Sequence, residues 1–143
     1  MKAHRYSTIL TAAFALNVGA LLVQAADGAP EHWEAPARSA KKKNPVASSE
    51  ASLIRGREVY IKECASCHGD QGRGDGPGVK DLEVKPGDLK DPQVTGQSDG
   101  ALFWKITEGR KPMPSFAENY SDDDRWNLVN YLRKLTGKTT TQP

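Results

Sequence analysis

The stretch Cys64-Ala65-Ser66-Cys67-His68 decides how this 143-residue chain is interpreted, because it holds both cysteines and a histidine directly after the second. The pattern C-x-x-C-H is the attachment signature of a c-type haem. Two thiols three positions apart can form thioethers with the two vinyl groups of one porphyrin, and the adjacent histidine then lies under the iron. The motif therefore predicts one covalently bound haem c, with Cys64 and Cys67 as attachment points and His68 as an iron ligand.

Two other kinds of site use paired cysteines. A thiol-redox C-x-x-C motif belongs in a β-α-β context, which this sequence does not indicate. A structural zinc site needs four nitrogen or sulfur ligands, and no second Cys/His pair follows His68. The haem interpretation is therefore preferred to a dithiol or a zinc site.

The N-terminal residues 1–25 have the pattern of a secretory signal peptide. Lys2 and Arg5 form a basic start, residues 9–23 are mostly apolar, and residues 23–25 (Val-Gln-Ala) carry small side chains at the offsets of a cleavage site. The apolar run is short for a membrane span, which needs about 20 residues. We expect export to the periplasm, with membrane association only if this segment stays uncleaved.

The charge balance argues against a nucleic-acid partner. The chain carries 20 Lys and Arg against 18 Asp and Glu. Lys2 and Arg5 belong to the predicted signal peptide, so its removal leaves 18 basic and 18 acidic residues. Nucleic-acid binding needs clustered positive charge, which a balanced mature chain does not offer.

Composition divides the remaining chain into three parts. Residues 26–48 are rich in Ala, Pro, Lys and Ser without a helical or strand period, and we expect them to form a flexible tether. Residues 49–136 form the one predicted domain, and residues 137–143 form a polar C-terminal tail. A domain this small buries a limited core, so a covalently held haem would supply part of its apolar interior.

Helical patterns dominate the predicted domain, and no segment has a clear strand pattern. A long loop over residues 69–97 is rich in Gly and Pro, and a loop of this length in a small domain usually needs a cofactor or a function to organise it. The expected helices are residues 50–64 capped by Ser48 or Ser49, residues 99–108 between Ser98 and Gly109, and residues 122–135 between Ser121 and Gly137.

The second axial position of the iron has one good candidate in the mature chain. Met113 lies in a loop between Pro112 and Pro114, which stiffen its backbone, whereas His32 lies in the expected tether. A packing methionine is the alternative, although a proline-flanked loop is not an apolar helix face. Thioether ligation opposite His68 would raise the reduction potential. It would also leave no open position for a substrate, which favours electron transfer over oxygen chemistry.

These features together resemble the class I monohaem cytochromes c, in particular small bacterial periplasmic ones. The resemblance covers residues 50–136: Gly56 and Tyr60 before C-A-S-C-H-G, then G-D-G-P, R-K-P-M-P-S-F and the W-N-L-V-N-Y-L-R-K-L helix. It implies an all-α cytochrome c fold, with three to four helices wrapped around one haem, long irregular loops and an exposed haem edge. It also implies that Gly56 and Tyr60 meet the last helix near Tyr131.

The resemblance implies further roles around the cofactor. The carbonyl of Pro77 would accept the proton of the second imidazole nitrogen of His68 and fix the ring, with Pro86 as the alternative. Arg110 and Trp104 are candidates for reaching a haem propionate, and each has an equally plausible role in packing or at the surface.

The expected function is that of an exported electron carrier rather than an enzyme, either free or as the cytochrome subunit of a dehydrogenase or respiratory complex. Single electrons would pass through the haem edge to redox protein partners, with Lys62, Lys105 and Lys111 as candidates for charge matching. A second hypothesis is a haem enzyme or gas sensor, which requires Met113 to be absent from the iron or easily displaced. A third is a haem-free thiol-redox module.

Overall fold

Helices make up the regular structure of residues 33–138, which are the residues that the computed structural model describes. The predicted signal peptide over residues 1–25, the start of the predicted tether and residues 139–143 lie outside this range. None of the helices within it has the length and apolar character needed to cross a membrane. In chain order the elements are α1 (Ala37–Ala40), α2 (Glu50–Val59), the π-helical turn η1 (Tyr60–Cys64), α3 (Ala65–His68), the 3-10 turn η2 (Pro77–Asp81), α4 (Pro92–Thr95), α5 (Asp99–Glu108) and α6 (Asp122–Leu135).

The three predicted helices are confirmed, and a serine caps each of them. In each case the hydroxyl oxygen accepts a hydrogen bond from a backbone N–H in the first turn, which would otherwise lack a partner. The first helix departs from its prediction after Val59, where the π-helical turn η1 leads into α3 and carries the helical path on to His68. The cap pairs are Ser49 with Ser52 at 3.2 Å, Ser98 with Ala101 at 3.2 Å, and Ser121 with Asp124 at 3.1 Å.

The first and last helices cross at a glycine, as the resemblance implied. A Cβ atom placed on Gly56 would lie 2.1 Å from the carbonyl oxygen of Asn127 and 2.8 Å from the Cβ of Tyr131. Four residues after Gly56, the ring centroid of Tyr60 lies 5.4 Å from that of Tyr131, which is within the favourable range for an aromatic pair. The missing side chain therefore allows the backbones of α2 and α6 to approach each other closely.

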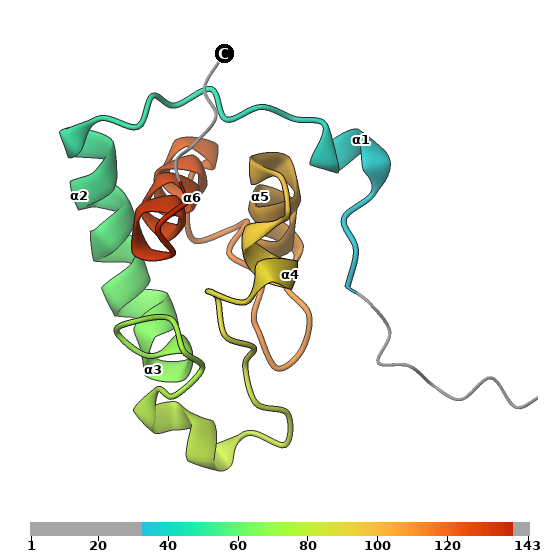
Figure 1. The fold of residues 1–143 in the computed structure, drawn as a ribbon, viewed down its shortest axis with the longest axis vertical. Coiled ribbons are helices and arrows are strands. Elements are labelled where there is room, and N and C mark those ends of the chain that lie inside the picture. Colours follow the sequence, from blue (N-terminus) through green and yellow to red (C-terminus); the bar gives the residue numbers. More distant parts are fainter. Residues whose placement is uncertain (1–32, 139–143) are drawn as a thin grey trace, which may run out of the picture. The chain divides into compact units, whose positions relative to one another are not determined.

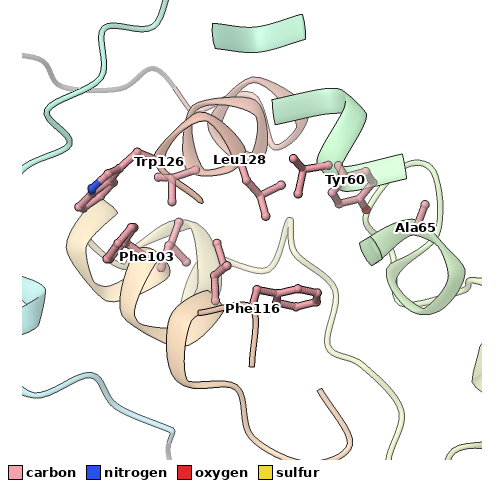
Figure 2. Packing of buried hydrophobic residues seen from close by; sticks show 10 residues of the cluster. Tyr60, Ala65, Phe103, Phe116, Trp126 and Leu128 are labelled. Carbon is pink, nitrogen blue, oxygen red and sulfur yellow. The ribbon is translucent and has the colours of Figure 1, made fainter. Parts of the chain in front are cut away.

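The hydrophobic core lies between α6, α5 and the end of the first helical segment (Figures 1 and 2). Phe103 of α5 stacks on Trp126 of α6 with ring centroids 3.9 Å apart. Leu128 and Tyr60 are almost completely buried on the other side of this interior. Phe116, from the loop before α6, is also buried in the same cluster. These side chains hold the elements that surround the predicted cofactor.

Residues 33–48 were expected to belong to a flexible tether, and for this segment the prediction is wrong. The segment lies against the helices, with α1 packed beside α5 and the chain then running to the start of α2 (Figure 1). Asn44 Nδ2 donates to Asn130 Oδ1 at 2.8 Å, and the Ser98 hydroxyl donates to the carbonyl of Ala40 at 2.6 Å. Contacts with residues far along the chain, rather than a local period, hold this segment in place.

Candidate functional site

The C-x-x-C-H motif lies where the first helical segment ends. Cys64 closes η1, while Cys67 and His68 lie in α3, so the two sulfurs are three positions apart on one helical face. Gly69 ends α3 with a positive φ of 76°, a conformation that residues with a Cβ rarely adopt. The buried hydroxyl of Tyr60 donates to the carbonyl of Gly69 at 2.6 Å and fixes this exit. The sequence thus forms a rigid platform for the motif.

The His68 side chain is half-buried, and one of its ring nitrogens lacks a hydrogen-bond partner among the described residues. Its Nδ1 atom is inaccessible to solvent and has no hydrogen-bond partner among the described residues. Burial lowers the pKa of His68, and the backbone of Gly87 partly opposes this shift. The ring is therefore neutral near pH 7, which is the form that binds metal. An unpaired buried nitrogen is costly unless a ligand or an acceptor completes its environment.

The loop around Pro86 and Gly87 lies closer to the imidazole than the sequence alone indicated. Pro86 and Gly87 line a cavity together with His68, and Gly87 is the residue whose backbone affects the imidazole pKa. Pro77 begins η2 and does not line either of the two cavities described below. No hydrogen bond within residues 33–138 joins His68 to Pro77 or to Pro86, so the assignment of its acceptor stays a prediction.

Met113 is held in a tight loop that faces the motif. Backbone hydrogen bonds run in both directions between Arg110 and Met113, at 3.0 and 2.9 Å. Gly109 allows the loop to fold back, since a Cβ atom there would lie 2.5 Å from the carbonyl of Pro114. The Met113 side chain is half-buried and packs against the core cluster. The loop therefore places the thioether of Met113 at the cavities that His68 also lines.

Two adjoining cavities, of about 190 and 210 Å³, are both lined by Cys64, His68 and Met113. Together their volumes fall within the roughly 300–1,000 Å³ that is usual for cofactor and ligand sites. Cys67 lines the second cavity. Most other lining side chains are apolar, among them Leu102, Ile106, Leu128, Leu132 and Phe116. The structure thus brings the four predicted haem-binding side chains around one apolar space, as a largely apolar macrocycle requires.

The charged residues that line the cavities are mostly basic. Lys85, Arg110 and Lys111 line the second cavity with one acidic residue, Glu63, and Lys105 lines the first. A haem carries two propionate carboxylates, so this excess of positive charge suits the cofactor. Of the two propionate candidates suggested earlier, Arg110 lies at the cavity, whereas Trp104 lines neither of them.

Among the cavity residues that the sequence did not indicate, one comes from outside the predicted domain. Trp33 lines both cavities although it precedes the predicted domain. Its ring centroid lies 6.2 Å from that of Trp104. A large aromatic residue in a proline-rich segment was the only available signal, and nothing in a local pattern connects it with residues 70 positions or more away.

The thiol-redox and zinc hypotheses find little support in this geometry. Burial raises the pKa of the Cys64 thiol to about 12, and Glu63 and Cys67 add to this shift. Reactive cysteines instead have lowered pKa values, because the thiolate is the nucleophile. Within the described range, no group of three or more His, Cys, Asp and Glu side chains is placed to hold a metal ion.

Comparisons with known proteins cover the same part of the chain. Residues 51–132 match the model of the family described as cytochrome c oxidase, cbb3-type, subunit III. A cbb3-type cytochrome c oxidase subunit CcoP from Azospirillum sp. (strain B510) is 30% identical over 97 residues, which are 66% of this chain and 32% of that protein. Cytochrome c6 from Porphyra purpurea is 27% identical over 88 residues, which are 62% of this chain and 76% of that protein.

A solved structure agrees with these matches. A chain of the reducing HAO-like protein complex of Kuenenia stuttgartiensis superposes with a TM-score of 0.59 at 36% sequence identity. The match covers 64% of this chain and 46% of the Kuenenia chain. This chain therefore spans about a third of the Azospirillum protein and less than half of the Kuenenia chain.

Proposed function

We propose that His68 and Met113 are the axial iron ligands of this protein, which belongs to the family described as cytochrome c oxidase, cbb3-type, subunit III. As a member of this family, the chain is an electron-transfer cytochrome c with the cytochrome c fold and covalent haem c. The observation that carries this proposal is that both side chains line the same two apolar cavities as Cys64. The bound haem supplies an iron that stores and releases one electron. With His68 and Met113 both bound to it, the iron would have no position left for a substrate, so we propose a carrier rather than an enzyme.

Each residue of the site then has a distinct task. Thioethers to Cys64 and Cys67 would hold the macrocycle against α3. One imidazole nitrogen of His68 would bind the iron, and the other would donate to a backbone carbonyl, the usual arrangement for a ligating histidine. Pro77 and Pro86 are the candidate acceptors, and the position of Gly87 beside the ring favours Pro86.

The environment of the site supports a reduction potential above that of a bis-histidine or water-exposed haem. A Met113 thioether favours ferrous iron, and the apolar lining disfavours the additional positive charge of the ferric state. Electrons would enter and leave through the haem edge beside Val84, which is 64% exposed and lines the second cavity.

We propose that the protein works in the periplasm and passes electrons to or from a redox protein, as a free carrier or as part of a respiratory complex. One similar protein is named as a subunit of a cytochrome c oxidase, and another is a chain of a reducing HAO-like protein complex. The basic side chains of Lys85 and Lys111 at the cavity rim would orient an acidic partner surface.

Substitution of Met113 tests the ligand assignment. Met113→Ala should keep the covalent haem, lose the weak long-wavelength ferric band of sulfur ligation and lower the reduction potential by more than about 59 mV, a tenfold change in a one-electron equilibrium. The reduced variant should also bind carbon monoxide rapidly.

Ile54→Ala, at an exposed apolar residue of α2 that lines neither cavity, is the control and should keep the spectrum and potential of the wild type. A Met113→Ala protein with an unchanged ferric band and potential would contradict the proposal. Rapid carbon monoxide binding by the wild type would instead favour the haem enzyme or gas sensor.

A further inference from the structure

The segment from Trp33 to Val46, here called the strap, is attached to the helical domain at its C-terminal end through a buried amide network. Asn44 Nδ2 donates to Asn130 Oδ1 at 2.8 Å and to the carbonyl of Trp126 at 3.2 Å. Asn130, which has no exposed surface, donates in turn to the carbonyl of Val46 at 3.0 Å. Because buried amides are costly to leave unpaired, this end of the strap is fixed on α6.

The middle of the strap lies directly on α5. The Ser98 hydroxyl that caps α5 also donates to the carbonyl of Ala40 at 2.6 Å. Gly100, in the first turn of α5, allows close approach of the strap backbone: a Cβ atom there would lie 2.3 Å from the carbonyl oxygen of Ser39 and 2.6 Å from that of Lys42. A glycine at this position of a helix disfavours the helical state by about 1 kcal/mol relative to alanine, and here it makes room for the strap.

The first residue of the strap, Trp33, lines both cavities. The Trp33 ring has Lys105 Nζ 5.2 Å and Arg110 Cζ 5.1 Å from its centroid, both within cation–π range. It also packs against Trp104. Lys105 is half-buried, and this burial lowers the pKa of its ammonium group. Two cations and a second indole thus hold one aromatic ring against both cavities.

We propose that the strap is a built-in cover of the haem, with Trp33 as the side chain that excludes water from the cofactor. This inference rests on the placement of the haem in the cavities of the proposed function. Trp33 lies outside residues 51–132, the part of the chain that matches the family model.

The physical consequence of the cover is a shift in the redox equilibrium. Water admitted beside the macrocycle stabilises the ferric state, which carries one more positive charge than the ferrous state. Loss of the ring would also allow the Lys105 ammonium group to move toward solvent, and this would weaken the positive field that opposes oxidation. Both effects favour ferric iron, so removal of Trp33 should lower the potential.

The experiment compares full-length variants produced in a host that matures c-type cytochromes. In Trp33→Ala, we expect the ferrous–ferric equilibrium against a fixed redox standard to shift about three- to tenfold toward ferric iron, at most about 59 mV. Trp33→Phe should shift it less. Gly100→Ala, which displaces the strap and leaves Trp33 intact, should shift it in the same direction.

Arg38→Ala, on an exposed residue of α1 in the same strap, is the control and should match the wild type. All variants should keep the spectroscopic signature of the wild-type ligands, which separates loss of the cover from loss of the fold. A Trp33→Ala protein with an unchanged potential would overturn the proposal. If the wild type lacks the sulfur-ligation band, the Met113 assignment fails, and the Trp33 comparison still tests the cover.

Discussion

The crossing of α2 and α6 makes Gly56→Ala the most informative stability variant. The added methyl carbon would lie 2.1 Å from the carbonyl oxygen of Asn127. Even close C–H···O contacts have C···O distances of about 3.3 Å or more, so the helices would have to separate by roughly 1 Å at this point. The obstacle is backbone and cannot move by a rotamer change, so the strain falls on the packing of the whole pair.

Two opposing magnitudes decide the sign of this effect. Overpacking of a tight core costs about 1–3 kcal/mol and occasionally more. Alanine in place of glycine in a helix recovers about 1 kcal/mol. Because the obstacle is backbone, the overpacking cost lies in the upper part of this range, at about 2–3 kcal/mol. We therefore expect the free energy of unfolding to fall by about 1–2 kcal/mol, which would lower Tm by roughly 4–16 °C for a domain of this size.

Thermal unfolding of the oxidised haem protein, followed by far-UV circular dichroism, measures the effect. Arg57→Ala is the matched control, because this exposed side chain is the next residue of the same helix. The control should stay within about 0.5 kcal/mol of the wild type. A Gly56→Ala protein as stable as the wild type would refute the close crossing and support a surface glycine without a packing role.

Two further predictions concern charged residues of α6. Arg133 is almost completely buried, and its Nε donates to Asp99 Oδ1 at 2.7 Å. Arg133→Ala leaves the Asp99 carboxylate without this partner and should lower the free energy of urea unfolding by about 3–5 kcal/mol. An effect below about 1 kcal/mol would contradict a stabilising role of this ion pair. The Arg55 guanidinium, 2.7 Å from Asp124, holds the pKa of that carboxyl below its usual range. The stabilisation is present above the unfolded-state pKa of about 3.9 and is lost as pH falls through the lower folded-state pKa. Asp124→Asn should cost about 0.2–1 kcal/mol at pH 7 and reduce the loss of stability below pH 4, whereas an unchanged pH dependence of urea unfolding would contradict the pairing.

Local signals in the sequence were sufficient for the main helices. Serine caps, the terminal glycines and the apolar face of α6 act within one or two turns, so their effects are readable without the fold. The spacing of Cys64, Cys67 and His68 likewise defines its chemistry locally. Met113 required only the elimination of other ligands, and the structure places it beside His68 at the same cavities.

The strap could not be predicted, because its stability comes from contacts across the chain. Pro36 and Pro45 interrupt any regular period, and such segments usually stay disordered. Asn44 is nevertheless held by Asn130, 86 positions further on. The orientation of His68 was also beyond the sequence, since the choice between Pro77 and Pro86 depends on the path of an irregular loop.

The most direct test of the account is an optical spectrum of the full-length protein in both oxidation states, together with the mass of the denatured chain. The account predicts a mass that includes haem, a sharp α-band on reduction and a weak long-wavelength ferric band from sulfur ligation. Covalent haem with a high-spin spectrum would contradict Met113 as the sixth ligand. A chain without haem would contradict the central claim altogether.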